Sequence, residues 1–203
     1  MAEKTERKSI EAPEDGIQQF GELYALIYIY MAKEFVDSFG KKGEEALRRA
    51  IRNYGHHRGR RLRERHEAMG LPITVKTLFE HYDLPDDNRF RRNPIELTDY
   101  TRYSETLVCP YSEIWAELGL SHLGVFYCME FHQAMWEAYI SDITVELPKT
   151  LTKGDEKCRF EVYRKGYKKN IPDPAPKEQM GKNPSKNHKK SFSPSAGRNQ
   201  REG

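Results

Sequence analysis

The strongest constraint on the fold is a run of apolar residues with helical spacing near the start of the chain. Within residues 17–39, apolar side chains recur at Phe20, Leu23, Tyr24, Leu26, Ile27, Ile29, Tyr30, Met31 and Phe35. Steps of three and four residues follow the period of an α-helix, and the apolar stripe is wide. We therefore expect a well-buried helix that ends at Gly40.

A second helix is expected over residues 43–69, and its apolar face contains an arginine. The face comprises Ala46, Leu47, Ala50, Ile51, Tyr54, Gly55, Arg58, Gly59 and Leu62. Glycine weakens a helix by about 1 kcal/mol relative to alanine, so Gly55 and Gly59 indicate that another helix or a ligand approaches the backbone closely. The guanidinium of Arg58 needs a carboxylate partner, which either the protein or a small acid could supply.

A strand is predicted over residues 98–108, which are rich in threonine, tyrosine and valine. Its alternation places one set of side chains on a single face, and Cys109 continues that face. The set is Thr101, Tyr103, Glu105 and Leu107. Before this strand, residues 83–97 are expected to form an irregular connection that follows a short helix over residues 74–82.

Helices and strands continue to the end of the body. Pro110 fits the first turn of a helix over residues 110–118, and a further helix is expected over residues 121–140. Residues 143–147 and 157–163 alternate and predict a hairpin. The fold class is therefore α+β: an N-terminal helical pair packed on a small antiparallel sheet with further helices, in a single domain.

The two ends of the chain differ in composition from the body over residues 16–167. Residues 1–15 are charged and predict a flexible N-terminus. Residues 168–203 hold nine Lys and Arg against three Asp and Glu, with five prolines, which predicts a disordered basic tail. A basic tail could bind nucleic acid, and this stays open as an alternative, but Phe192 is the single aromatic residue of the tail, so we expect a solvated extension and no nucleic-acid partner.

Composition and hydropathy favour a soluble protein of the cytoplasm. The most apolar run, residues 23–35, contains Lys33 and Glu34 and is shorter than the roughly 20 residues that span a bilayer. We therefore expect no membrane association. The N-terminus lacks the apolar region of a secretory signal, and three cysteines without a CxxC pair fit a reducing compartment.

Cys109 is the cysteine with the clearest chemical setting. It precedes Pro110 and is expected to cap a helix, where free N–H groups and the helix dipole favour a thiolate. A thiolate there could act as a nucleophile, with the same N–H groups receiving an oxyanion. The alternative is a buried cysteine that fills space in the core.

The other two cysteines leave a metal site open as an alternative. Cys128 lies one helical turn before His132, so the pair could bind a metal or hydrogen-bond, or His132 could bond a backbone carbonyl. Cys158 shares a strand face with Phe160 and Val162. Together with Cys109 these residues match zinc in ligand type, but four protein ligands would make a closed, structural site. We therefore expect no cofactor, with zinc as the alternative.

An ordered series of short blocks resembles the L-2-amino-thiazoline-4-carboxylic acid hydrolase family over about residues 20–163. The series is Gly43-Glu44-Glu45-Ala46-Leu47, Tyr54-Gly55-x3-Gly59, Cys109-Pro110, Tyr127-Cys128-x3-His132 and Gly154-Asp155-x2-Cys158-x-Phe160. The last block is also similar to one in small-molecule-binding domains of the 4-vinyl reductase type, which include sensors without catalytic activity.

The resemblance implies hydrolysis of a C–N bond in a small cyclic amidine or amide that carries a carboxylate. In this interpretation Cys109 is the nucleophile, His132 transfers protons, and Cys128 tunes the site or acts as a second thiol. The substrate-binding candidates are Arg58 for the carboxylate, with Tyr54, Tyr103, Glu105 and Trp136.

Two alternatives to the cysteine hydrolase remain open. One is a small-molecule-binding protein without turnover, with a pocket lined by Tyr24, Tyr54, Tyr103 and Trp136. The other is a hydrolase whose nucleophile is a metal-bound hydroxide. In each case the expected partner is a small molecule, and a homo-oligomer is compatible with the sequence.

Overall fold

The computed structural model describes residues 14–85 and 87–171, and the fold is α+β as expected. The predictions of a flexible N-terminus over residues 1–15 and of a disordered tail over residues 168–203 concern residues that lie almost entirely outside the described ranges. The elements are α1 (Glu14–Ala68), α2 (Val75–Glu80), β1 (Arg91–Leu97), β2 (Thr101–Val108), α3 (Pro110–Glu117), α4 (Ser121–Tyr139), β3 (Ile143–Lys149), the 3-10 turn η1 (Leu151–Lys153) and β4 (Cys158–Arg164). No described helix is long and apolar enough to cross a bilayer.

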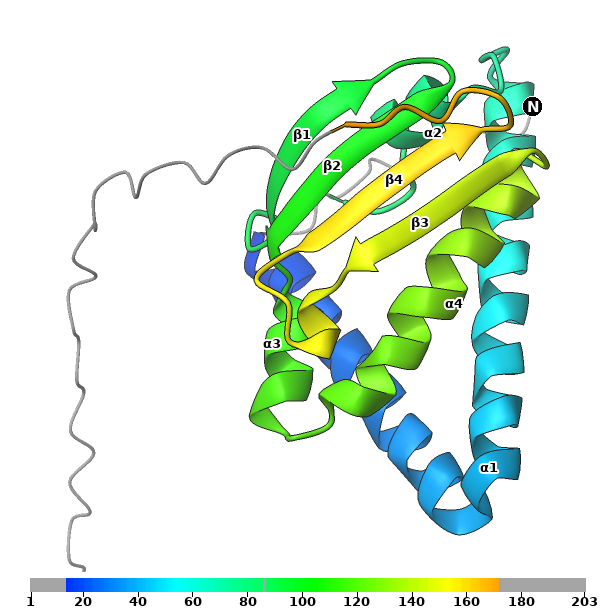
Figure 1. Cartoon of the computed structure of the whole chain (residues 1–203). Helices are drawn as coiled ribbons and strands as arrows, with labels where there is room; N and C mark the ends of the chain where they lie inside the picture. The colour runs from blue at the N-terminus through cyan, green and yellow to red at the C-terminus, as the bar shows by residue number, and fades with distance from the viewer. Residues whose placement is uncertain (1–13, 86, 172–203) are drawn as a thin grey trace, which may run out of the picture. The chain divides into compact units, whose positions relative to one another are not determined.

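Helix α1 consists of two arms that meet in a sharp bend at Gly40. The first arm comprises residues 14–39 and the second arm residues 41–68. The backbone of Gly40 has φ 55° and ψ −133°, a conformation that residues with a side chain rarely adopt. At Gly43 a Cβ atom would overlap the carbonyl oxygen of Phe35. The close approach of the two arms next to the bend therefore requires a second glycine. The predicted helix end at Gly40 is confirmed, and Figure 1 shows the two arms as a V.

The first arm of α1 is buried along one side only, so the expectation of a well-buried helix is wrong. Ala25, Ile29 and Ala32 are fully buried on the side that faces the body of the protein. The opposite side exposes large apolar residues. These are Phe20, Leu23, Ile27, Tyr30 and Met31. The sequence stripe was wide because it combines two stripes on opposite sides of the helix.

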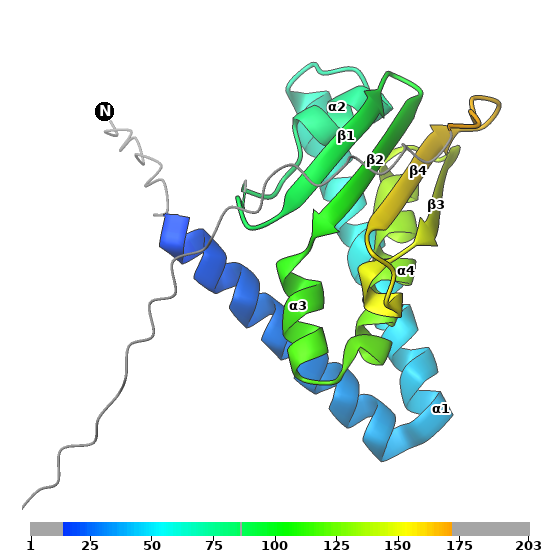
Figure 2. The ribbon, with the colours of Figure 1, turned by 60° about the vertical axis from the view of Figure 1, so that its left-hand side comes forward.

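A four-stranded antiparallel sheet in the order β1-β2-β4-β3 carries the helices on one face (Figures 1 and 2). The predicted hairpin is confirmed as the β3–β4 pair. Residues 91–97, expected to be irregular, form the edge strand β1. Pro94 hid this strand in the sequence, because proline is usually excluded from β-sheets. It is tolerated here because β1 is an edge strand and the β1–β2 register shifts after Pro94.

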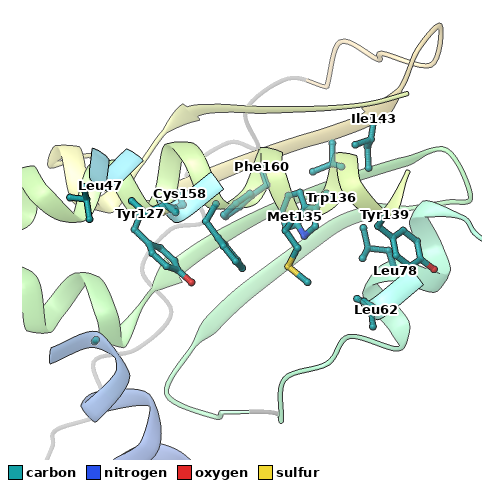
Figure 3. Close-up of a cluster of buried hydrophobic side chains, with 14 of the residues drawn as sticks. Leu47, Leu62, Leu78, Tyr127, Met135, Trp136, Tyr139, Ile143, Cys158 and Phe160 are labelled. Carbon is teal, nitrogen blue, oxygen red and sulfur yellow. The ribbon is translucent and has the colours of Figure 1, made fainter. Parts of the chain in front are cut away.

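The β2–β4 register defines which side chains of β2 face the helices. Ser104 pairs with Phe160 and Thr106 with Cys158. Cys158 and Phe160 belong to the core, which α4 supplies with Met135, Trp136 and Tyr139 (Figure 3). The even-numbered residues of β2 therefore face the helices, and the odd-numbered set that includes Tyr103 and Glu105 lies on the outer face.

The segment after β4 contacts the outer face of the sheet. The hydroxyl of Tyr103 accepts a hydrogen bond from the Lys169 amide at 2.8 Å and donates one to the Lys169 carbonyl at 3.1 Å. Lys169 also pairs with Glu96, and Lys168 pairs with Glu146. Lys168 and Lys169, which the sequence assigned to the tail, thus contact the sheet.

Helix α4 packs against the second arm of α1 at two glycines. A Cβ atom at Gly59 would overlap the carbonyl oxygen of Met135. At Gly55 it would lie 2.9 Å from the Cβ of Ala134 and 3.0 Å from the Phe131 carbonyl oxygen. The close approach that the sequence indicated is therefore made by a helix, and it brings Arg58 to the surface of α4.

Substitution of Gly59 by alanine is expected to destabilise the protein. The methyl group forces the backbones of α1 and α4 apart, and overpacking of this kind outweighs the gain in helix propensity by about 2 kcal/mol. Gly21→Ala is the matched control, because its nearest neighbour at 3.0 Å is the flexible guanidinium of Arg89. Urea unfolding should show a loss for Gly59→Ala and none for Gly21→Ala. Equal stabilities of the two variants would contradict the close approach.

Candidate functional site

Arg58 is held by a carboxylate of the protein. Its Nε and Nη2 atoms donate to the two oxygens of Asp83 at 2.8 and 2.6 Å, which is a bidentate pair. Burial is the largest effect and lowers the pKa of Arg58, but the hydrogen bonds to Asp83, together with the electrostatic effects of Asp83, Tyr82 and Tyr54, raise it overall. The sequence left open whether Arg58 pairs with a protein carboxylate or with a small acid. In the structure its partner is the protein carboxylate Asp83, so in the free protein the Nε and Nη2 donors of Arg58 are not available to a substrate.

Aromatic side chains surround Arg58. The guanidinium lies 5.4 Å from the ring centres of both Tyr82 and Phe131. Tyr54 stacks on Phe131 at 5.5 Å, so the predicted association of Tyr54 with Arg58 is observed. Outside this layer is a groove of about 420 Å³. Its lining residues are Tyr54, His57, Arg58, Arg61, Leu62, Arg65 and Asp83.

Arg102 is a second arginine on the helix-facing side of β2. Its guanidinium lies 4.2 Å from the ring centre of Phe79 and 5.9 Å from that of Phe160. Within residues 14–85 and 87–171 it makes no hydrogen bond or ion pair with a carboxylate. Burial lowers the pKa of Arg102 to about 10. Arg102 remains charged at neutral pH, without an anion to balance it.

Sequence reasoning missed Arg102 because it followed the other face of the strand. The odd-numbered residues of β2 contain Tyr103 and Leu107 and look like the core set, whereas the even-numbered residues are an arginine, a serine, a threonine and, at the end of the strand, a valine. The polar character of the even-numbered set, opposite the apolar β4 residues Phe160 and Val162, was the available signal.

His132 lies beside this second arginine. Its ring centre is 5.0 Å from those of Trp136 and Phe160, so the predicted residues His132 and Trp136 share one cluster. Burial, followed by the charges of Arg102 and Arg58, lowers the pKa of His132 to about 3. The imidazole is therefore neutral at physiological pH. Its Nδ1 atom is buried and has no hydrogen-bond partner among the described residues.

The three thiols gather next to this cluster. Cys109 is the N-cap of α3, as predicted, Cys128 lies on α4, and Cys158 begins β4. They are close enough for Cys109 to affect the pKa of Cys128 and for Cys158 to affect that of Cys109. Within the described ranges, however, no three His, Cys, Asp or Glu side chains are arranged to hold a metal. The structure does not assemble the Cys₃His ligand set.

The predicted thiolate at Cys109 is wrong for the free protein. Burial raises the pKa of Cys109 to about 11, although the nearby N–H groups of Ser112 and Tyr111 oppose the effect. Burial also raises the pKa of Cys128 and of Cys158. The helix end does favour the anion, but loss of solvent around the sulfur is the larger effect.

Glu105 and Tyr103 do not join the site. A carboxylate oxygen of Glu105 lies 2.8 Å from the Lys157 amine, and the other accepts a hydrogen bond from Asn93 at 3.1 Å. Both partners lie on the outer face of the sheet, where Tyr103 binds the backbone of Lys169. The predicted set is thus divided between the two faces of the sheet, and only Tyr54, Arg58, His132, Trp136 and the thiols lie on the helix side.

Comparison of the sequence with known protein families identifies the family of this chain. The L-2-amino-thiazoline-4-carboxylic acid hydrolase family matches residues 21–162 of the chain. No curated protein sequence matches.

Two solved structures are similar to this chain at low sequence identity. A trafficking protein particle complex subunit 3 from Naegleria fowleri, covalently bound to palmitic acid, is 15% identical over 75% of this chain and 99% of its own, with a TM-score of 0.46. The phenol-responsive sensory domain of the transcription activator PoxR, solved with phenol, is 17% identical over 73% of this chain and 74% of its own, with a TM-score of 0.40.

The lowered pKa of His132 predicts a loss of stability in acid. The unfolded chain binds a proton near pH 6.5, whereas the folded protein does so only near pH 3. Stability is therefore complete above pH 6.5 and falls as the pH drops, by about 2 kcal/mol between pH 7 and pH 5. Urea unfolding at the two pH values should show a flatter dependence for His132→Phe than for the wild type.

The control for this experiment is His122→Phe, which changes an exposed histidine on the same helix. It should leave the pH dependence unchanged. A wild-type slope in His132→Phe would contradict the neutral, buried imidazole.

Proposed function

The chain belongs to the L-2-amino-thiazoline-4-carboxylic acid hydrolase family, and we propose that it hydrolyses a C–N bond in a small cyclic amidine or amide that carries a carboxylate. The observation that carries this proposal is Arg102. Two arginines lie close to His132 on the helix side of the sheet, but only Arg58 is paired with a carboxylate. A substrate carboxylate would balance Arg102.

Arg102 suits a small planar acid for two reasons. A guanidinium can bind both oxygens of a carboxylate at once, and aromatic surroundings strengthen that bond by excluding water. Phe79, Phe160 and Trp136 provide such surroundings. Arg102 and His132 are only half-buried, so both retain accessible surface for a ligand.

Substrate binding would also change the state of His132. In the free protein the positive charges of Arg102 and Arg58 disfavour an imidazolium. A bound carboxylate brings a negative charge beside the ring and raises the pKa of His132 toward neutrality. His132 then becomes suited to proton transfer, because a general acid or base works best with a pKa near the working pH. The site would be activated by its own substrate.

The geometry favours Cys128 over Cys109 as the nucleophile for a substrate held at Arg102. Cys128 lies one helical turn from His132, so its thiol and the imidazole can exchange a proton.

In the proposed reaction the sulfur of Cys128 attacks the amidine or amide carbon, and its proton passes through His132 to the substrate nitrogen. The C–N bond then breaks, and its electron pair stays on the protonated nitrogen. Water attacks the remaining thioester-like carbon and releases the product, while a proton returns to the sulfur. Each step uses only the thiol, the imidazole and water.

A second candidate function is binding without turnover. It is favoured by the pKa values of the three thiols, all of which burial raises, so none is a thiolate in the free protein. The Arg102 site would then recognise the same class of carboxylate. Substitution of the cysteines can distinguish hydrolysis from binding without turnover.

Substitution of Arg102 by methionine is expected to abolish binding while making the protein more stable. The change removes the guanidinium that would pair with the ligand carboxylate, and it also removes an unbalanced, half-buried charge, whose removal stabilises the fold by up to about 1 kcal/mol. Calorimetric titration with 2-aminothiazoline-4-carboxylate should show at least about 100-fold weaker binding.

Arg49→Met, at an exposed position of α1, is the control and should leave both affinity and stability unchanged. The methyl ester of the ligand should bind the wild type as weakly as the acid binds Arg102→Met. Unchanged affinity in Arg102→Met would remove the proposal.

Serine substitutions of the three cysteines are expected to separate the functions. Cys128→Ser should abolish hydrolysis of the same compound and leave its affinity within about twofold, because the alcohol is a far weaker nucleophile. Cys109→Ser and Cys158→Ser should retain turnover. Hydrolysis that persists in Cys128→Ser and stops in Cys109→Ser would instead assign the nucleophile to the helix end. Tight, Arg102-dependent binding with no product in the wild type would establish the second candidate.

A further inference from the structure

The first arm of α1 carries an apolar surface that no described element covers. We call it the outer stripe, and it consists of Phe20, Leu23, Ile27, Tyr30 and Met31. Each of these side chains is between 55% and 67% exposed. Figure 2 shows this arm at the edge of the fold, with α3 along one side of it. Soluble proteins rarely leave so many large apolar side chains together in water.

The outer stripe has the geometry of a helix-packing seam. Phe20, Leu23, Ile27 and Tyr30 are spaced by three, four and three residues, which is the a/d pattern of two helices that pack along their length. A groove of about 430 Å³ runs over it. The groove is lined by Phe20, Leu23, Tyr24, Leu26, Ile27 and Tyr30.

We propose that the outer stripe is the interface of a homodimer, in which the first arms of two α1 helices pack against each other. A large apolar or aromatic side chain presents on the order of 150–250 Å² when fully exposed, so the five residues, each a little over half exposed, offer about 500–600 Å² in each copy. Complete burial of the stripe in both copies would remove about 1,100 Å² from water, close to the roughly 1,000 Å² that a specific interface needs.

The charge at the end of the stripe does not determine the direction of the helix pair. Glu34 lies one turn beyond Tyr30 and is exposed in line with the seam. A parallel pair would bring the two Glu34 carboxylates together. An antiparallel pair places each Glu34 toward the start of the other copy's α1, where the positive end of the helix dipole is accompanied by the acidic residues Glu14 and Asp15. A second copy therefore complements the stripe in shape and in polarity.

The test is the mass of the full 203-residue chain by sedimentation equilibrium at about 1–100 µM. We expect a dimer of twice 23.8 kDa. Leu23→Glu combined with Ile27→Glu should raise the dimer dissociation constant at least about 100-fold, because two charges would be buried in each half of the interface. Circular dichroism should show that the double variant keeps the helix and sheet content of the wild type.

Phe39→Glu is the matched control. Phe39 is 64% exposed but lies on another side of the arm, where it contacts Phe35, and its replacement should leave the dimer intact. A wild type that is monomeric at the highest concentration, or a dimer that survives the double variant, would overturn the proposal. Dimerisation only after deletion of residues 1–13 would assign the stripe to the chain's own N-terminal segment, and binding of a monomer to phosphatidylcholine vesicles would assign it to a lipid surface. Either result also overturns the dimer.

Discussion

The contact between α1 and α4 at Gly55 and Gly59 determines the positions of Arg58 and His132 in the candidate site. Two helices can lie this close only where one of them lacks side chains, and the contact fixes α4 between the second arm of α1 and the sheet. Arg58, between the two glycines, therefore reaches the aromatic layer at Phe131. His132, next along α4, faces the sheet and Arg102.

The second organising feature is an excess of positive charge on the helix side of the sheet. Arg58 is paired with Asp83, whereas Arg102 contacts aromatic rings, and burial, followed by the charges of both arginines, keeps His132 neutral. A fold that needed only stability would replace Arg102 by an apolar residue. This unbalanced charge is the basis of the proposal that a carboxylate ligand completes the site, in a family named for a carboxylic acid.

Local structural elements were predictable from the sequence, whereas the burial of individual side chains and the residues that they contact were not. The helix end at Gly40, the β3–β4 hairpin and the N-cap at Cys109 follow from one or two residues each, and all three are confirmed. The state of the Cys109 thiol depends on how much solvent surrounds it, which the sequence does not encode locally. Arg102 was missed because the two faces of β2 can be told apart only from the register with β4.

The two hydrogen bonds between Tyr103 and Lys169 change how the basic end of the chain should be understood. Lys168 and Lys169 are neutralised by Glu146 and Glu96 of the sheet, so only the seven Lys and Arg after residue 171 remain to attract a polyanion. A shortened protein that ends at Tyr167 would lose these contacts together with the charge. The domain boundary for any such deletion therefore lies beyond Lys169, because these two lysines anchor the chain to the sheet.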